Sequence, residues 1–99
     1  IEGMATLLII EDDADIRDLL RLHGERAGHR VETAGDGSTA LRLLASKSYD
    51  LALIDWMLPE VSGLEVLKTV RSKYPLMGAM MITARTSNED VIAALEAGA

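Results

Sequence analysis

The stretch at residues 6–13 reads TLLIIEDD, and it decides the fold class. Its first five residues form an aliphatic run without helical spacing, which predicts a short buried strand at residues 6–10. Acidic residues follow at once, so the strand ends in a polar turn. A helix is predicted from Ala14 to a stop at Gly28, because residues recur there at steps of three and four, namely Ile16, Leu19, Leu20, His23 and Ala27.

This strand-then-helix unit is repeated three more times along the chain. Short predicted strands at residues 30–34, 51–54 and 79–82 are each followed by a segment with helical spacing, at residues 38–47, 64–73 and 88–97. The expected inward-facing residues of these helices are Ala40, Leu41, Leu44, Ala45, Leu64, Leu67, Val70, Val91, Ile92 and Leu95. Continuous apolar strands alternating with amphipathic helices are typical of a parallel sheet covered on both faces. The chain therefore reads as (βα)4 in a doubly wound α/β sheet.

Composition narrows the classes of function. A chain of 99 residues is long enough for one domain. The net charge of −6 and the pI near 4.7 argue against a nucleic-acid surface, which needs clustered Lys and Arg. Cysteine is absent, which fits a reducing compartment, and no apolar run approaches the roughly 18 residues that span a bilayer. We expect a cytoplasmic protein that binds neither membrane nor nucleic acid directly.

Acidic residues and a hydroxyl follow three of the predicted strands. Glu11 and Asp12 follow the first strand, Asp55 ends the third, and Thr83 ends the fourth. In a doubly wound sheet these positions meet at the carboxyl ends of the strands, where ligands bind. Three carboxylates in one pocket repel each other, which raises the pKa of at least one of them unless a cation compensates. A hard divalent ion with oxygen ligands, Mg²⁺, is the expected cation.

Four motifs at these strand ends resemble the response-regulator receiver family. They are LIIEDD at residues 8–13, DWMLP at residues 55–59, SGLE at residues 62–65 and Thr83-Ala84. Within the family the chain is most similar to receivers attached to winged-helix DNA-binding regulators. The resemblance implies a flavodoxin-like fold with (βα)5 units, of which this chain would hold four in the strand order 2-1-3-4.

The resemblance also implies a role for each site residue. Asp55 would be the phosphorylated nucleophile, Asp12 a direct Mg²⁺ ligand, and Glu11 a ligand through water. Met57 would offer its backbone carbonyl to the metal, and Thr83 would donate a hydrogen bond to the phosphoryl oxygen. The implied partners are a sensor histidine kinase and an effector domain outside this chain. Phosphorylation would then switch the surface around the fourth helix and so control an output, which for this subfamily is transcription.

Residues 1–3 resemble the remainder of an expression-tag linker, so we expect a receiver domain at residues 4–99. The family's fifth strand, its Lys-Pro pair and its fifth helix have no counterpart here, and Lys47, Lys68 and Lys73 do not match the family's phosphate-binding lysine. We therefore expect phosphorylation slowed by on the order of 10² to 10³, since a donor aimed at developing charge is missing. We also expect self-association through the exposed edge at residues 79–82 or through the uncovered sheet face.

The sequence also allows other interpretations of single residues and of the function. Asp13 is interpreted as a helix N-terminal acid. Glu11 and Asp12 would be interpreted in the same way if no other acidic residue accompanied them at the strand ends. His23 and His29 are interpreted as structural rather than as phosphoryl carriers. A Mg²⁺-dependent aspartyl phosphatase of the haloacid-dehalogenase type would want an Asp at the position of Met57. A phosphorylation-silent, receiver-like dimerisation module is the other alternative.

Overall fold

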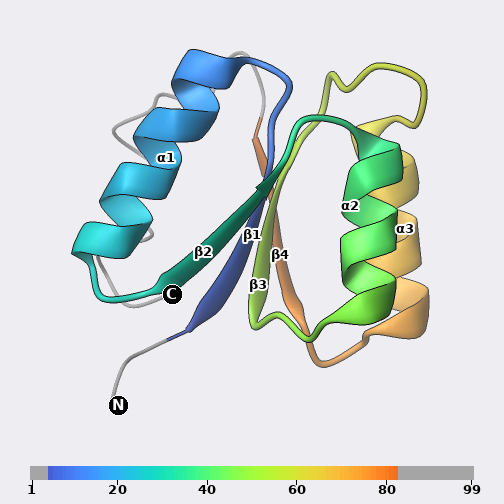
Figure 1. The fold of residues 1–99 in the computed structure, drawn as a ribbon. Helices are drawn as coiled ribbons and strands as arrows, with labels where there is room; N and C mark the ends of the chain where they lie inside the picture. Colours follow the sequence, from blue (N-terminus) through green and yellow to red (C-terminus); the bar gives the residue numbers. More distant parts are fainter. Residues whose placement is uncertain (1–4, 83–99) are drawn as a thin grey trace.

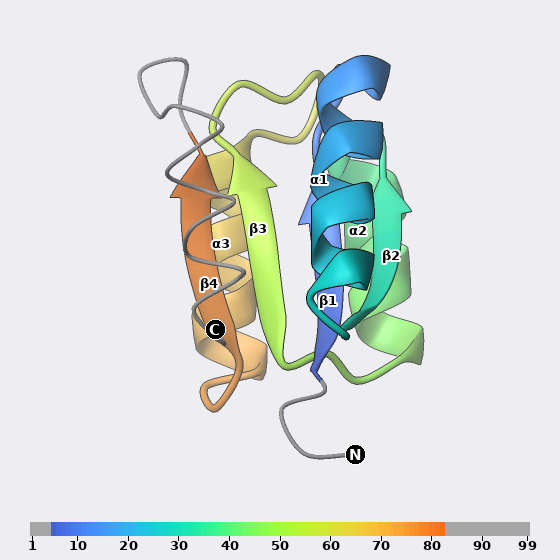
Figure 2. The same ribbon diagram turned by 90° about the vertical axis from the view of Figure 1, so that its left-hand side faces the viewer.

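The computed structural model describes residues 5–82 and places four parallel strands in one sheet. The strands are β1 (Thr6–Ile10), β2 (Arg30–Ala34), β3 (Leu51–Asp55) and β4 (Gly78–Ile82). Their order is β2-β1-β3-β4, visible in Figure 2. This confirms the predicted doubly wound sheet and its strand order. The predicted helix at residues 88–97 lies outside the described residues.

Within residues 5–82, three helices cover the two faces of this sheet. The helix α1 (Ala14–Arg26) lies on one face, and α2 (Gly37–Ser46) and α3 (Gly63–Lys73) lie on the other (Figure 1). The winding of the chain reverses between β1 and β3, which are hydrogen-bonded neighbours. The crevice beyond the carboxyl ends of these two strands is therefore the place where a doubly wound sheet binds its ligand.

The core is aliphatic and divided by the sheet into two clusters. β1 runs through the middle, and its residues from Leu7 to Ile10 are all fully buried. Because side chains alternate along a strand, Leu7 and Ile9 pack on the α1 side, and Leu8 and Ile10 pack on the α2 and α3 side. Both faces of β1 are thus apolar, which explains the continuous hydrophobic run in the sequence.

The inward faces of the helices differ in detail from the prediction. Leu64 is 38% exposed and Ala45 is also exposed, although both were expected to face inward. Leu19, which fits the helical spacing of the first helix, is 36% exposed. In α1 the buried residues are Leu20 and Gly24, one turn apart, because the helix meets the sheet along a narrow stripe. In α3 the buried apolar residues are Val66 and Val70, which leaves Leu64 on the outer side.

Short polar residues begin each helix. Asp13 accepts hydrogen bonds from the amides of Asp15 and Ile16 at the start of α1, which confirms that it is a helix N-terminal acid. Asp36 caps α2 and Ser62 caps α3 in the same way. These caps fix where each chain segment turns from a strand into a helix. None of the helices within residues 5–82 is long and apolar enough to cross a membrane.

Candidate metal centre

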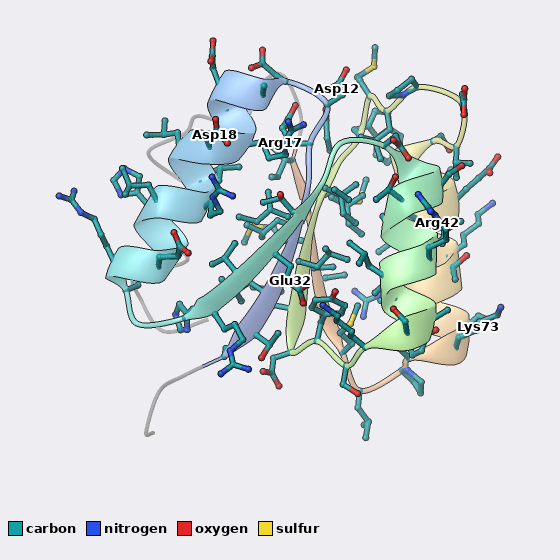
Figure 3. All side chains as sticks on the ribbon, in the orientation of Figure 1. Asp12, Arg17, Asp18, Glu32, Arg42 and Lys73 are labelled. Atoms are coloured by element: carbon teal, nitrogen blue, oxygen red, sulfur yellow. The ribbon has the colours of Figure 1, made fainter. Side chains whose placement is uncertain are left out.

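Three carboxylates meet at the carboxyl ends of β1 and β3. Glu11, Asp12 and Asp55 each offer an oxygen, and these oxygens lie within 4.8 Å of one another. Glu11 is 5% exposed and Asp55 is 9% exposed, whereas Asp12 is exposed. Figure 3 shows Asp12 at the end of the sheet where β1 passes into α1. The predicted convergence of these three residues is therefore present in the fold.

Backbone hydrogen bonds hold the two buried carboxylates in place. The amide of Asp13 donates to Oε1 of Glu11 at 3.1 Å, so the turn after β1 orients that side chain. The amide of Met57 donates to Oδ1 of Asp55 at 3.1 Å, in the turn after β3. The next amide after Asp55, that of Trp56, donates to the carbonyl of Ile82 at 2.8 Å and extends the sheet by one bond. Each acidic side chain is thus oriented by the chain segment that leaves its strand.

Burial and mutual repulsion disfavour the charged forms of these carboxyls. Burial raises the pKa of Glu11 from 4.5 to about 7, the Asp13 amide opposes this rise, and the neighbouring Asp55 adds to it. Burial also raises the pKa of Asp55, against the lowering effect of the Met57 amide. The cluster therefore holds a proton at a pH where an ordinary carboxyl would be ionised.

The donor set of this cluster suits a divalent cation. The oxygens are close enough to share one small ion, and carboxylates are the ligands that Mg²⁺ prefers. The ion pairs between described side chains, Arg21–Asp18 and Lys47–Glu32, involve none of the three carboxylates. Neither of these ion pairs therefore supplies a positive charge to the buried carboxylates. The chemistry of the donor set agrees with the predicted magnesium site.

The remaining predicted site residues are placed as follows. The side chain of Met57 is 70% exposed, and its backbone amide donates to Asp55. Thr83 lies outside the described residues, directly after Ile82, which pairs with Asp55 in the sheet. His29 is buried and accepts a hydrogen bond from the amide of Ala5 at 3.1 Å, which fits the structural role predicted for it.

Two residues at the site were not identified from the sequence. Nη1 of Arg17 donates to the backbone carbonyl of Glu11 at 2.9 Å. Gly63 begins α3 against the main chain of Asp55, so closely that a Cβ would lie 2.2 Å from the Asp55 carbonyl oxygen. Each contact is made to the backbone carbonyl of a residue in another segment of the chain. No rule of sequence spacing predicts such contacts. Gly63 belongs to the SGLE motif at residues 62–65, but the motif itself does not indicate this contact.

A hollow of about 420 Å³ lies at the opposite end of the sheet, before β3 and β4. Two of its polar lining residues are paired, since Asp50 accepts a hydrogen bond from the amide of Thr6 at 2.7 Å and Lys47 contacts Glu32 at 2.6 Å, whereas the buried hydroxyl of Tyr49 has no hydrogen-bond partner among the described residues. None of the three carboxylates lines this hollow, so the candidate metal site and the hollow are separate features of the described fold.

Comparison with known sequences identifies the family. The model of the response regulator receiver domain matches residues 7–99. The transcriptional regulatory protein AfsQ1 of Streptomyces coelicolor is 43% identical over 96 residues, which cover 97% of this chain and 42% of that protein. The alkaline phosphatase synthesis transcriptional regulatory protein PhoP of Bacillus subtilis is 37% identical over 93 residues, covering 94% and 39%. The chain thus spans about two fifths of the length of these relatives.

Solved structures agree. A response regulator receiver domain protein from Methanospirillum hungatei is 32% identical with a TM-score of 0.80, covering 97% of this chain and 77% of that one. The response regulator TrrA from Thermotoga maritima, solved in complex with Mg²⁺-BeF, is 31% identical with a TM-score of 0.78, covering 91% and 79%. With its fold, its acidic cluster and its sequence in agreement, the chain belongs to the response regulator receiver domain family.

Proposed function

We propose that this domain accepts a phosphoryl group on Asp55 from a sensor histidine kinase, in a step that depends on Mg²⁺. The observation that carries the proposal is the meeting of Glu11, Asp12 and Asp55 at the switch point of the sheet. A buried carboxylate beside two further acids is poised to bind a metal and a phosphoryl group together.

The metal would be held by this chain's oxygens. Asp12 and Asp55 would bind it directly, Glu11 through a water molecule, and Met57 through its backbone carbonyl. When bound there, Mg²⁺ would neutralise charge on the phosphoryl group during transfer. The Met57 amide fixes Oδ1 of Asp55, which orients the carboxylate and leaves its other oxygen to act as the nucleophile.

In the proposed transfer an oxygen of Asp55 attacks the phosphorus of the kinase's phosphohistidine. The new P–O bond forms as the P–N bond breaks, and the electron pair of the broken bond goes to the imidazole, which takes up a proton. Asp55 becomes an acyl phosphate. The Thr83 hydroxyl would donate a hydrogen bond to the transferred group, and the surface around the predicted fourth helix would change between two states.

Beryllofluoride, which mimics an acyl phosphate, gives a test that needs no kinase. Titrated with Mg²⁺ present, it should change the fluorescence of Trp56, which follows Asp55 directly and is 45% exposed. The response should require Mg²⁺ and vanish in Asp55→Asn. A response that persists in Asp55→Asn, or that is the same without Mg²⁺, contradicts the proposal.

The output and location belong to the proposal as well. AfsQ1 and PhoP are named as transcriptional regulators, which supports control of transcription through an effector domain. We expect the domain to act in the cytoplasm beside its kinase. A Mg²⁺-dependent phosphatase is disfavoured, because Met57 stands where that chemistry would want an acid; release of many phosphates per chain from a phosphomonoester would revive it.

Two of the predictions made from the sequence concern the 99-residue chain itself. β4 is the last strand of the described sheet and pairs with β3, and residues 78–81 are half-buried, so self-association through this edge is expected. A single monomeric mass by light scattering at high concentration would exclude it. Slow phosphorylation by a small phosphodonor is expected too. A complete lack of phosphorylation, together with self-association, would instead favour the phosphorylation-silent dimerisation module.

A further inference from the structure

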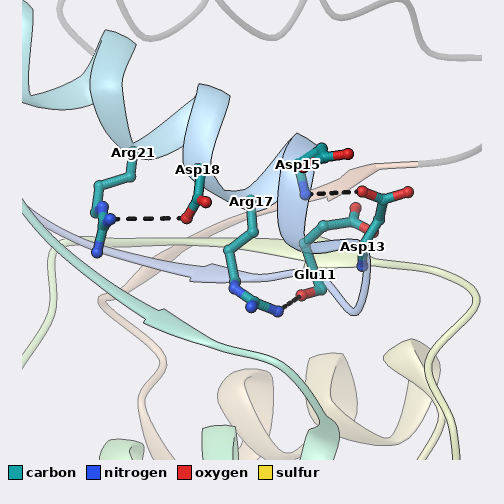
Figure 4. A network of polar contacts seen from close by, with 6 residues as sticks. All are labelled: Glu11, Asp13, Asp15, Arg17, Asp18 and Arg21. Atoms are coloured by element: carbon teal, nitrogen blue, oxygen red, sulfur yellow. Dashed lines mark hydrogen bonds and ion pairs between the residues drawn. The ribbon is translucent and has the colours of Figure 1, made fainter.

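The side chain of Arg17 crosses from α1 to the turn that carries the acidic residues. Its Nη1 donates to the carbonyl oxygen of Glu11 at 2.9 Å, as Figure 4 shows. Arg17 is half-buried, and its own amide donates to the carbonyl of Asp13 at 2.9 Å. Both the backbone and the side chain of this residue therefore hold the turn after β1.

The carbonyl that Arg17 binds is the first one beyond the sheet pairing of β1. The last paired residue of β1 is Ile10, which is opposite Ala34 and Ile54. The amide of Glu11 still donates to Ala34 at 3.0 Å, but its carbonyl lies beyond both neighbouring ladders. The guanidinium supplies the hydrogen bond that a strand neighbour would otherwise give.

That carbonyl belongs to the peptide joining Glu11 to Asp12. Fixing its direction fixes how the two acidic residues project from the end of β1. Because the bond goes to the backbone, Arg17 takes up no carboxylate oxygen that a metal would need. We propose that Arg17 is a positioning residue for the metal site: it orients the Glu11–Asp12 peptide so that both carboxylates reach one cation. This inference rests on the proposed function.

Gly35, at the end of β2, leaves room for this guanidinium. A Cβ on Gly35 would lie 3.0 Å from Nη1 and 3.8 Å from Cζ of Arg17. Gly35→Ala should therefore push the guanidinium away from the Glu11 carbonyl while leaving the positive charge in the protein. Gly35→Ala thus changes the position of the Arg17 guanidinium without removing its charge.

Charge and positioning predict opposite effects on metal affinity. Removing a positive charge near the site should strengthen Mg²⁺ binding, because it removes the Coulomb repulsion between the guanidinium and the cation. Loss of orientation should weaken it, and partners that orient metal ligands typically change affinity about 10- to 100-fold. Arg21 is the matched control, since it lies one turn further along α1 and pairs with Asp18, away from the cluster (Figure 4).

The experiment titrates MgCl₂ into the 99-residue chain and its variants, with Trp56 fluorescence as the signal. Arg17→Met should weaken binding about 10-fold, Arg17→Lys should recover part of this loss, and Arg21→Met should bind as tightly as wild type or more tightly. Gly35→Ala should weaken binding as well. In EDTA, the amide resonance of Asp12, which lies in the peptide that Arg17 holds, should shift in Arg17→Met and not in Arg21→Met.

The inference is overturned if Arg17→Met binds Mg²⁺ as tightly as wild type, or more tightly. It is equally overturned if the loss in Arg17→Met is matched by Arg21→Met. Should Arg17→Met fail to fold, Arg17→Lys and Gly35→Ala decide the matter by the same criterion. A wild-type chain that does not bind Mg²⁺ at all would instead remove the proposed function, so the two failures are distinguishable.

Discussion

At the scale of single residues, the site places two acids where their charge is disfavoured. Glu11 and Asp55 are almost fully buried. Burial raises the pKa of both carboxyls, and the neighbouring Asp55 raises the pKa of Glu11 further. Each keeps one backbone amide as a partner, which orients it without neutralising it. The metal-free site is therefore strained electrostatically, and this strain is what a bound cation would relieve.

The metal-free chain should lose stability as pH rises through the ionisation of Glu11. Its pKa is raised from 4.5 to about 7 in the folded chain, so between these values the folded state holds more protons than the unfolded state. The free energy of unfolding should fall by on the order of 2 kcal/mol over this range, less than the full shift implies because exposed Asp12 leaves the cluster open to water.

Urea unfolding in EDTA at a series of pH values measures this loss, and Glu11→Gln is the control that isolates it. The difference between the two profiles should be largest above pH 7 and vanish below pH 4.5. Parallel profiles for wild type and Glu11→Gln would show that Glu11 is not the group responsible.

Asp12 and Asp13 are neighbours with different roles, and paired substitutions should separate them. Asp12→Asn should weaken Mg²⁺ binding at least about 10-fold and leave the free energy of unfolding in EDTA nearly unchanged, since Asp12 is exposed. Asp13→Ala should cost about 1 kcal/mol by removing the cap of α1, with a smaller effect on Mg²⁺ affinity. Equal effects of both variants on Mg²⁺ affinity would contradict these assignments.

At the scale of elements, α3 is set against the end of β3 by a contact that only glycine permits. Gly63 is buried, and its Cα lies so near the Asp55 carbonyl that a side chain would overlap with it. The capping hydroxyl of Ser62 starts the helix at this point. The close packing of α3 against the end of β3 thus requires that residue 63 has no Cβ atom.

Gly63→Ala should move the first turn of α3 or the Asp55 backbone. The expected loss of unfolding free energy is about 1–3 kcal/mol, as for overpacked sites, together with weaker Mg²⁺ binding. Gly78→Ala is the matched control, because its Cβ would meet the flexible end of Leu51 at 3.1 Å and the Asp50 carbonyl oxygen at an ordinary contact distance of 3.4 Å, at the other end of β4 from the site. If urea unfolding and Mg²⁺ titration show equal effects for both variants, the close contact at Gly63 has no special role.

Element boundaries also show what the sequence could and could not predict. The strands were found within one residue, because aliphatic runs followed by acids or glycines mark them clearly. The helix faces were less accurate: Leu19 and Leu64 satisfy the spacing rule and still face outward. Spacing alone gives a set of apolar positions, whereas the stripe that is buried depends on how each helix lies across the sheet.

At the scale of the whole molecule, topology explains why the site was predictable. Once four strand-then-helix units imply a parallel sheet, residues after β1 and β3 must meet at one edge, so Glu11, Asp12 and Asp55 could be grouped before any coordinates. The contacts of Arg17 and Gly63 could not be predicted in this way. They depend on the packing of α1 and α3 to within an ångström, which no periodicity encodes.

The central claim is that Asp55 is the phosphoryl acceptor of a Mg²⁺-dependent site. Its most direct test is intact mass spectrometry, with peptide mapping, after prolonged incubation with acetyl phosphate and MgCl₂. We predict one added phosphoryl group, located on Asp55, formed slowly, lost in Asp55→Asn and prevented by EDTA. A chain that binds Mg²⁺ but gains no phosphoryl group, or gains one on another residue or without Mg²⁺, would contradict the account.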